Sequence, residues 1–280
     1  TKNLALRFVA GETLDEALNA ARSLNARGMK VTLDALGENI SSEAGAVTAA
    51  SNYRAIIDRI VESGIDSSVS LKLTMLGLDI DPALCQQHMT TILDRARETG
   101  IFVRIDMEGS AYTQRTLDLF YELHRTYGDT VGIVLQSYLY RTDRDVHQAI
   151  EQGARVRLVK GAYAEPAAVA YPSKREVDAA YRREMEMLLD AGKYPAIATH
   201  DETIIEVATS YALRMGIAPD RFEFQMLYGI RRDLQDRLAR EGFNVRIYVP
   251  FGSSWYPYFM RRMAERPANL LFVVRNLVRA

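Results

Sequence analysis

The sequence predicts a protein of the α/β class, folded as a (β/α)₈ barrel of the TIM type. Three observations support this fold class. Strand-like segments alternate with charged amphipathic helices roughly eight times along the chain. The length of 280 residues suits one such barrel, so we expect a single domain over residues 1–280. Within the strands, apolar and polar residues alternate with a period of two.

The strand segments are short and rich in alternating β-branched and aromatic residues. We expect strands at residues 29–36, 68–76, 101–108, 131–137, 155–161, 194–200, 221–227 and 244–250. The clearest helical patterns between them cover residues 84–100, 113–128 and 179–192. Each of these patterns ends at a glycine, which commonly closes a helix. A doubly wound open sheet is the structural alternative, but no G-x-G-x-x-G turn follows the first strand.

The two faces of the predicted strands differ in polarity. The apolar face, which we expect to meet the helices, carries Val31, Leu33, Leu71, Leu73, Val103, Ile105, Ile133, Leu135, Phe222, Phe224, Val245 and Ile247. The polar face, which we expect to line the barrel interior, carries Asp34, Ser70, Lys72, Thr74, Arg104, Asp106, Glu108, Gln136, Arg157, His200, Glu223, Gln225, Arg246 and Tyr248. Buried charges are costly unless they pair with each other or with a ligand. The pattern therefore predicts a binding site; the alternative is that the charges only neutralise each other.

The overall composition is that of a soluble globular protein, with 48% hydrophobic and 25% charged residues. A net charge of −1 and the lack of basic runs argue against a nucleic-acid partner. The single cysteine, Cys85, excludes an internal disulfide and favours a reducing, cytoplasmic location. Its helical context predicts a packing role. No segment approaches the ~20 apolar residues of a membrane span.

The region after the last predicted strand combines aromatic residues with two adjacent arginines. We expect a C-terminal helix at residues 253–266, on which Tyr258, Arg261 and Arg262 share one side. Two guanidinium groups beside a tyrosine form a fork suited to a carboxylate or phosphate. A solvated basic turn is the alternative, but such a turn would not need the neighbouring aromatic residues.

Two strand ends carry further candidate site residues. We consider them because the sites of such barrels form at the carboxyl ends of the strands and in the loops that follow. Lys160 and Gly161 end the fifth strand: the lysine can donate to an anionic ligand, and the glycine permits close backbone approach. Thr199, His200 and Asp201 end the sixth strand. An imine-forming role for Lys160, as in an aldolase-like barrel lyase, is the rival interpretation.

The remaining motifs argue against metal or triad chemistry. His88, His124 and His147 fall in helical segments, and we expect them at the surface. No two histidines have metal-ligand spacing, so we expect no metal site. The sequence contains no G-x-S-x-G, P-loop or C-x-x-C motif.

Several segments together resemble the proline dehydrogenase family, whose members are FAD-dependent enzymes of proline catabolism. The segments are VLQSYLYRT, RLVKGAY, ATHDE, FEFQMLYG and YVPFGSSWYPYFMRR. The resemblance covers nearly the whole chain and is to the monofunctional bacterial type rather than to the catalytic domain of the bifunctional flavoenzyme. It implies a distorted form of the (β/α)₈ barrel.

The resemblance also implies roles for individual residues. The catalytic residues would be Asp106 and Arg157. The substrate-binding residues would be Lys72, Tyr163, Leu227, Tyr248, Tyr258, Arg261 and Arg262. The FAD-binding residues would be Met107, Gln136, Arg157, Lys160, Gly161, Ala162, Thr199 and His200. Ala164 stands where some relatives carry an aromatic residue against the adenine, so the contacts at that end of FAD stay open.

The reaction implied is hydride transfer from C5 of L-proline to FAD, which yields Δ1-pyrroline-5-carboxylate and passes electrons on to a membrane quinone. Besides the aldolase-like lyase, a flavin barrel acting on another small amino acid or a folate remains an alternative. A third alternative is that the chain is a non-enzymatic module that binds a partner or docks on a membrane. The tail, residues 268–280, is amphipathic, and we expect it to pack on the barrel; peripheral contact with the inner face of the membrane is the alternative.

Overall fold

The computed structural model describes residues 7–37, 40–256, 258 and 260. The strands are β1 Lys30–Ala35, β2 Ser67–Leu71, β3 Val103–Ile105, β4 Val131–Gln136, β5 Arg155–Val159, β6 Ala196–Ala198, β7 Glu223–Leu227 and β8 Asn244–Phe251. The α-helices are α2 Leu14–Asn25, α3 Glu43–Ser63, α4 Pro82–Thr99, α5 Ser110–Tyr127, α6 Thr142–Glu151, α7 Lys174–Ala191, α8 Glu202–Met215 and α9 Arg232–Arg240. Short 3₁₀ segments are η1 Leu73–Leu76, η2 Gly128–Thr130 and η3 Pro219–Arg221.

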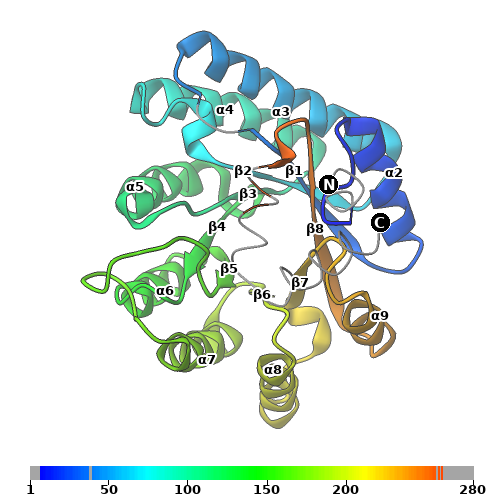
Figure 1. The fold of residues 1–280 in the computed structure, drawn as a ribbon, viewed down its shortest axis with the longest axis vertical. Coiled ribbons are helices and arrows are strands. Elements are labelled where there is room, and N and C mark those ends of the chain that lie inside the picture. Colours follow the sequence, from blue (N-terminus) through cyan, green and yellow to red (C-terminus); the bar gives the residue numbers. More distant parts are fainter. Residues whose placement is uncertain (1–6, 38–39, 257, 259, 261–280) are drawn as a thin grey trace, which may run out of the picture.

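The strands close into a barrel in the order β1 to β8 (Figure 1). Every neighbouring pair is parallel, and β8 pairs back to β1. Val31 shows how the barrel closes, because it lies opposite Ser67 of β2 on one side and Ile247 of β8 on the other. The predicted (β/α)₈ barrel is therefore confirmed.

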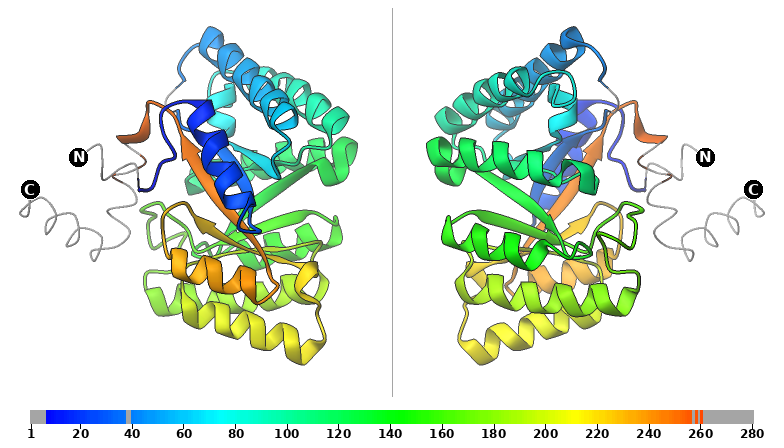
Figure 2. Two further views of the ribbon diagram at one scale, coloured as in Figure 1. Left: turned by 90° about the vertical axis from the view of Figure 1, so that its right-hand side faces the viewer. Right: turned by 90° about the vertical axis from the view of Figure 1, so that its left-hand side faces the viewer.

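The helices form an outer ring around the strands (Figures 1 and 2). Helices α3 to α9 each follow a strand. Helix α2 comes before β1 and packs beside β1 and β8, between α3 and α9 in Figure 1. The position beside β8 is thus filled by a helix that precedes the barrel, which is the departure from the regular (β/α)₈ plan.

Local sequence signals set the helix ends. Thr13 and Glu16 form a capping box at α2, in which each side chain accepts a hydrogen bond from the other residue's backbone N–H. Asp81 caps α4. The three predicted helices end as expected at glycines, which are Gly100, Gly128 and Gly192.

Several strands are shorter than predicted, most of all those expected at residues 68–76, 101–108 and 194–200. The segment 68–76 leaves the sheet after Leu71 and continues as η1, and the segment 101–108 is extended only over β3. The reason is a contact between the two departing segments, since Glu108 accepts a hydrogen bond from the Thr74 hydroxyl at 2.7 Å. The expectation that Glu108 and Thr74 face the barrel interior from strands is therefore wrong.

The apolar face of the strands forms the main core, as predicted. All twelve residues assigned to that face from the sequence are buried in one hydrophobic cluster with the inner faces of the helices. Cys85 is also fully buried in this cluster, which confirms its packing role. Burial raises the pKa of its thiol to about 12, which favours the protonated thiol over the nucleophilic thiolate at neutral pH.

The half of the barrel interior near the amino ends of the strands contains charges that pair with each other. Arg246 donates from Nε to Glu223 at 2.9 Å and from Nη1 to the Val31 carbonyl at 2.8 Å. Burial alone would raise the pKa of Glu223, but Arg246 lowers it to about 2. In this layer the charges neutralise each other, which is the alternative to a binding site that the sequence left open.

Arg104 crosses the same layer and is almost fully buried, at 1% exposure. Its Nη1 donates to the carbonyl oxygens of Ile133 at 3.0 Å and Arg155 at 2.5 Å. Gly132 makes room for it, because a Cβ at that position would lie 2.7 Å from Arg104 Nη1. Burial lowers the pKa of the Arg104 guanidinium well below its usual range.

The expected surface position of His88 is wrong. His88 is buried, and its Nδ1 lies 2.9 Å from the Leu76 carbonyl oxygen, because α4 presents this face to η1. His124 is half-buried and contacts the carbonyl oxygens of Gly128 and Gln152, whereas His147 is exposed. Across the described part of the chain, no helix combines the length and apolar character needed to cross a bilayer.

Replacing Glu223 with Gln should destabilise the protein by about 3 to 5 kcal/mol at pH 7, because Arg246 is left as an uncompensated buried charge. The folded-state pKa of about 2 lies below the ordinary 4.5. The stabilisation is therefore complete above about pH 4.5 and is lost as the pH falls toward 2. Urea unfolding of both proteins across this range should show the difference shrinking in acid.

Glu151→Gln, at an exposed position of α6, is the matched control and should leave stability unchanged. Equal stability of wild type and Glu223→Gln at pH 7 would contradict the importance of the Glu223–Arg246 pair.

Candidate functional site

A cavity of about 690 Å³ opens where the strands end and the following loops begin. All the site residues predicted from the sequence and described by the structure line it: Lys72, Asp106, Met107, Gln136, Arg157, Lys160, Gly161, Ala162, Tyr163, Thr199, His200, Leu227, Tyr248 and Tyr258. The two predicted clamp residues, Arg261 and Arg262, lie outside the described residues. Of the helix predicted at residues 253–266, the described residues Trp255, Tyr256, Tyr258 and Met260 are helical, whereas Ser253 and Ser254 form a turn.

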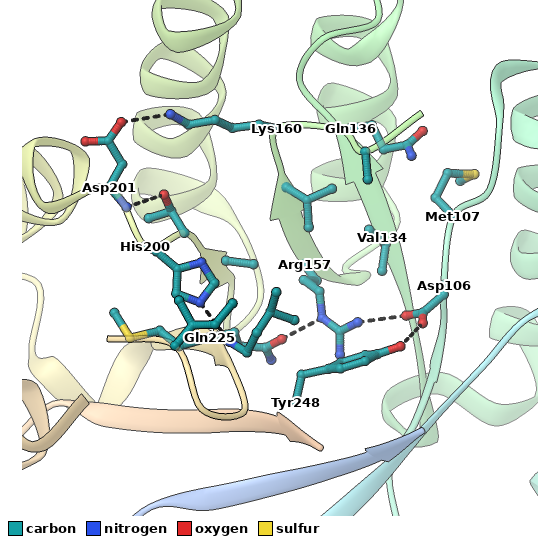
Figure 3. Close-up of a pocket in the computed structure, with 18 of the residues that line it drawn as sticks. Asp106, Met107, Val134, Gln136, Arg157, Lys160, His200, Asp201, Gln225 and Tyr248 are labelled. Atoms are coloured by element: carbon teal, nitrogen blue, oxygen red, sulfur yellow. Dashed lines mark hydrogen bonds and ion pairs between the residues drawn. The ribbon is translucent and has the colours of Figure 1, made fainter. Parts of the chain in front are cut away.

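Asp106 is the centre of a hydrogen-bond network at the inner end of the cavity (Figure 3). Its Oδ1 accepts from Arg157 Nη1 at 2.7 Å and from the Ser70 hydroxyl at 2.6 Å. Its Oδ2 accepts from the Tyr248 hydroxyl at 2.7 Å. Burial alone would raise the pKa of Asp106, but Lys72, Arg157 and these hydrogen bonds hold it below its usual range. Asp106 is therefore a buried carboxylate anion.

Arg157 is fixed in orientation from three sides (Figure 3). Its Nε donates to Gln225 Oε1 at 2.5 Å, and its Nη1 contacts Asp106. Its guanidinium carbon lies 5.3 Å from the centre of the Tyr248 ring. A buried cation with this many contacts is held ready for a ligand without further reorganisation.

Lys72 lies between two buried carboxylates. Its Nζ is 3.4 Å from Asp34 and 3.5 Å from Asp106. Burial alone would lower the pKa of Lys72, but the two carboxylates raise it above the ordinary value, so Lys72 stays charged. Burial raises the pKa of Asp34. The inner end of the cavity therefore holds two cations, Lys72 and Arg157, and two carboxyl groups.

A second cluster of charged side chains lies at the outer end of the cavity. Lys160 Nζ contacts Asp178 at 2.6 Å and Asp201 at 2.9 Å. Lys174 bridges the same two carboxylates. Burial alone would raise the pKa of Asp178 and Asp201, but Lys160 lowers both. The Lys160 ammonium is thus enclosed by carboxylates, whereas an imine-forming lysine must present a neutral amine.

His200 has a defined tautomer. The Leu227 N–H donates to His200 Nε2 at 2.9 Å, so the neutral ring carries its proton on Nδ1. The neighbouring Thr199 hydroxyl accepts from the Asp201 N–H at 3.1 Å. The end of β6 therefore presents an oriented imidazole to the cavity (Figure 3).

Gly161 and Gln136 are two residues of the cavity lining with distinctive surroundings. Gly161 has a φ of +119°, and a Cβ there would lie 2.5 Å from the ring of Tyr138, so only glycine fits. Gln136 is buried, and its Oε1 has no hydrogen-bond partner within the described residues. A buried acceptor of this kind calls for a donor, which a ligand in the cavity can supply.

Some residues that line the cavity or contact its lining were not assigned to the site from the sequence. Asp34, Ser70 and Gln225 were placed in the barrel interior by strand alternation, but nothing in the sequence indicated which partners they would meet. Lys174 and Asp178 lie in the first turns of α7 and carried no signal, because they look like an ordinary solvated helix start. The described residues contain no group of three or more potential metal ligands.

Comparison with known proteins gives a consistent result. The family model described as proline dehydrogenase matches residues 17–275. Proline dehydrogenase from Deinococcus radiodurans is 45% identical over 281 residues, covering 99% of this chain and 91% of that protein. Proline dehydrogenase 1 from Bacillus subtilis subsp. natto is 42% identical over 275 residues, covering 98% and 91%.

Among solved structures, the chain is similar to proline utilization A (PutA) from Bdellovibrio bacteriovorus inactivated by N-propargylglycine. The TM-score is 0.88 at 27% sequence identity. The match covers 94% of this chain but only 32% of the PutA chain, so this chain spans about a third of that longer protein. On the match of the family model and the identity to both proline dehydrogenases over nearly their whole length, the chain belongs to the proline dehydrogenase family.

Proposed function

We propose that this chain oxidises L-proline to Δ1-pyrroline-5-carboxylate, with FAD as its cofactor and a quinone as the final electron acceptor. Membership of the proline dehydrogenase family supports the substrate and the redox reaction. The observation that carries the proposal is the network at the inner end of the cavity, where Asp106 holds Arg157 and Tyr248, with Lys72 beside it. This arrangement provides oriented cations and an aromatic wall, but no nucleophile.

The residues present fit a dinucleotide cofactor. Gln136 offers a buried acceptor without a partner among the described residues, and Gly161, Lys160 and His200 line the same cavity. We propose that Met107, Gln136, Arg157, Lys160, Gly161, Ala162, Thr199 and His200 hold FAD. When bound, FAD would accept the electrons removed from proline.

The side chains of this chain would bind and orient the substrate. We propose that Arg261 and Arg262 hold the proline carboxylate, and that Lys72 adds a third cation. An apolar and aromatic wall would enclose the ring, built from Tyr163, Leu227, Tyr248 and Tyr258. Asp106 would act by keeping Arg157 and Tyr248 in place, since both of its carboxylate oxygens already accept hydrogen bonds from the protein.

The aldolase-like alternative has no supporting contact, because Lys160 is enclosed by Asp178 and Asp201. We further propose that residues 1–280 form one catalytic domain whose C-terminal helix carries the arginine clamp. The amphipathic pattern of residues 268–280 would suit either packing on the barrel or peripheral contact with a membrane that holds the quinone.

Purified protein should be yellow, and L-proline added without oxygen should bleach its visible flavin absorbance. D-proline at the same concentration should leave the spectrum unchanged within the time of the measurement, because its carboxylate would be misplaced relative to the clamp. A colourless protein whose amine is trapped by borohydride with a carbonyl substrate would instead support the lyase.

Arg262→Met should raise the KM for proline strongly, because removing one charge-assisted contact to a buried carboxylate costs about 2 to 4 kcal/mol. The variant should keep its FAD. Steady-state kinetics and the flavin-to-protein ratio check both statements. Arg214→Met, at an exposed position of α8, is the control. Unchanged proline affinity in Arg262→Met would exclude the proposed clamp.

Asp106→Asn should lower kcat/KM by about 100-fold, since it removes the charge that holds Arg157 and costs on the order of 3 kcal/mol. Tyr248→Phe removes one hydrogen bond to the same carboxylate and should have a smaller effect. Steady-state kinetics of the two variants, with circular dichroism to check folding, decides this. A larger effect for Tyr248→Phe would show that Asp106 is not the centre of the network.

A further inference from the structure

The loop between β5 and α7, residues 160–173, supplies one wall of the cavity through Gly161, Ala162 and Tyr163. Both ends of this loop are tied to the turn after β4. At its start, the Tyr138 N–H donates to the Lys160 carbonyl at 2.8 Å. At its end, the Tyr171 N–H donates to the Tyr138 carbonyl at 2.7 Å.

Between these anchors, Glu165 contacts a different part of the barrel. Its Oε1 accepts from the Ser110 N–H at 2.6 Å, and its Oε2 accepts from the Ser110 hydroxyl. The two residues are 55 positions apart in the sequence. Ser110 is the first residue of α5.

The sequence of α5 provides no side-chain cap of its own, as is also the case for α6, α8 and α9. Its N-cap residue is Gly109, which has no side chain, and its first turn contains no acidic residue. By contrast, α2, α3, α4 and α7 are capped by their own Thr13, Ser42, Asp81 and Ser173. Glu165 supplies both the missing acceptor and a negative charge at the positive end of an 18-residue helix.

The contact joins two walls of the cavity. Ser110 closely follows Asp106 and Met107, which line one wall, and Glu165 closely follows Ala162 and Tyr163, which line another. The Glu165 charge also adds to the effect of burial in raising the pKa of Tyr138, the residue whose ring lies against Gly161. Glu165 therefore acts near Tyr138, the residue whose backbone binds both ends of the loop.

We propose that Glu165 is a positioning residue: by binding the N-terminus of α5 it fixes residues 161–165 and so holds Tyr163 at the cavity wall. Neither Glu165 nor Ser110 is among the residues proposed to bind the substrate. The consequence for proline affinity rests on the function proposed above, whereas the fixing of the loop does not.

The experiment compares Glu165→Ala, Glu165→Gln and Ser110→Ala with the exposed control Glu151→Gln, all loaded with FAD. In Glu165→Ala, hydrogen exchange of the backbone at residues 161–169 should become about tenfold faster, since one charge-assisted cap is lost. The KM for proline should rise about tenfold, while kcat changes by less than about threefold. Glu165→Gln should lie between, because its amide oxygen still accepts from the Ser110 N–H.

Ser110→Ala adds an internal test. It should show a smaller effect than Glu165→Ala, because the backbone N–H remains, and its effect should largely disappear in the Glu165→Ala background. If Glu165→Ala fails to fold, Glu165→Gln carries the same comparison.

Unchanged exchange at residues 161–169 in Glu165→Ala would overturn the proposal, and so would faster exchange with an unchanged KM. A wild-type protein that is yellow but does not oxidise proline would instead contradict the proposed function. The retention of FAD by the variants would then replace the KM as the binding measurement, and equal retention in wild type and Glu165→Ala would overturn the positioning role.

Discussion

The site depends on one buried carboxylate, that of Asp106. It binds groups from three different strands, which are Ser70 of β2, Arg157 of β5 and Tyr248 of β8, and Lys72 lies next to it. A buried anion is stable only when it is surrounded in this way. Because each partner comes from a different strand, the network can form only in the closed barrel, and it fixes the orientation of the polar groups that bind Asp106.

The desolvation cost of the charges inside the barrel is offset in two ways. Near the amino ends of the strands, Glu223 and Arg246 pair directly, and Gly132 makes room for Arg104 against backbone carbonyls. In this layer the paired side chains occupy the barrel interior. Near the carboxyl ends the groups are also paired, but they surround a cavity rather than fill the space. The same strand alternation therefore builds a rigid base and, above it, a polar site that a charged ligand can enter.

The outer part of the site is assembled by loops and helix ends. Lys160 and Lys174 share Asp178 and Asp201, and Glu165 joins the loop after β5 to α5. These contacts lie closer to solvent than the Asp106 network, so each is individually weaker. Their effect is geometric, since they set the position of the loop relative to the strand ends.

The sequence by itself determined the fold class, because strand alternation and helix periodicity are local. It also determined which strand side chains face the barrel interior, but it wrongly extended that face to Thr74 and Glu108. With the family resemblance it also identified the lining residues from Lys72 to Tyr258 that the structure brings together. Tertiary structure decided the early ends of β2 and β3, the burial of His88, and the pairing of Glu165 with Ser110. These features depend on contacts between segments far apart in the chain, and no local pattern specifies which distant group a polar side chain will meet.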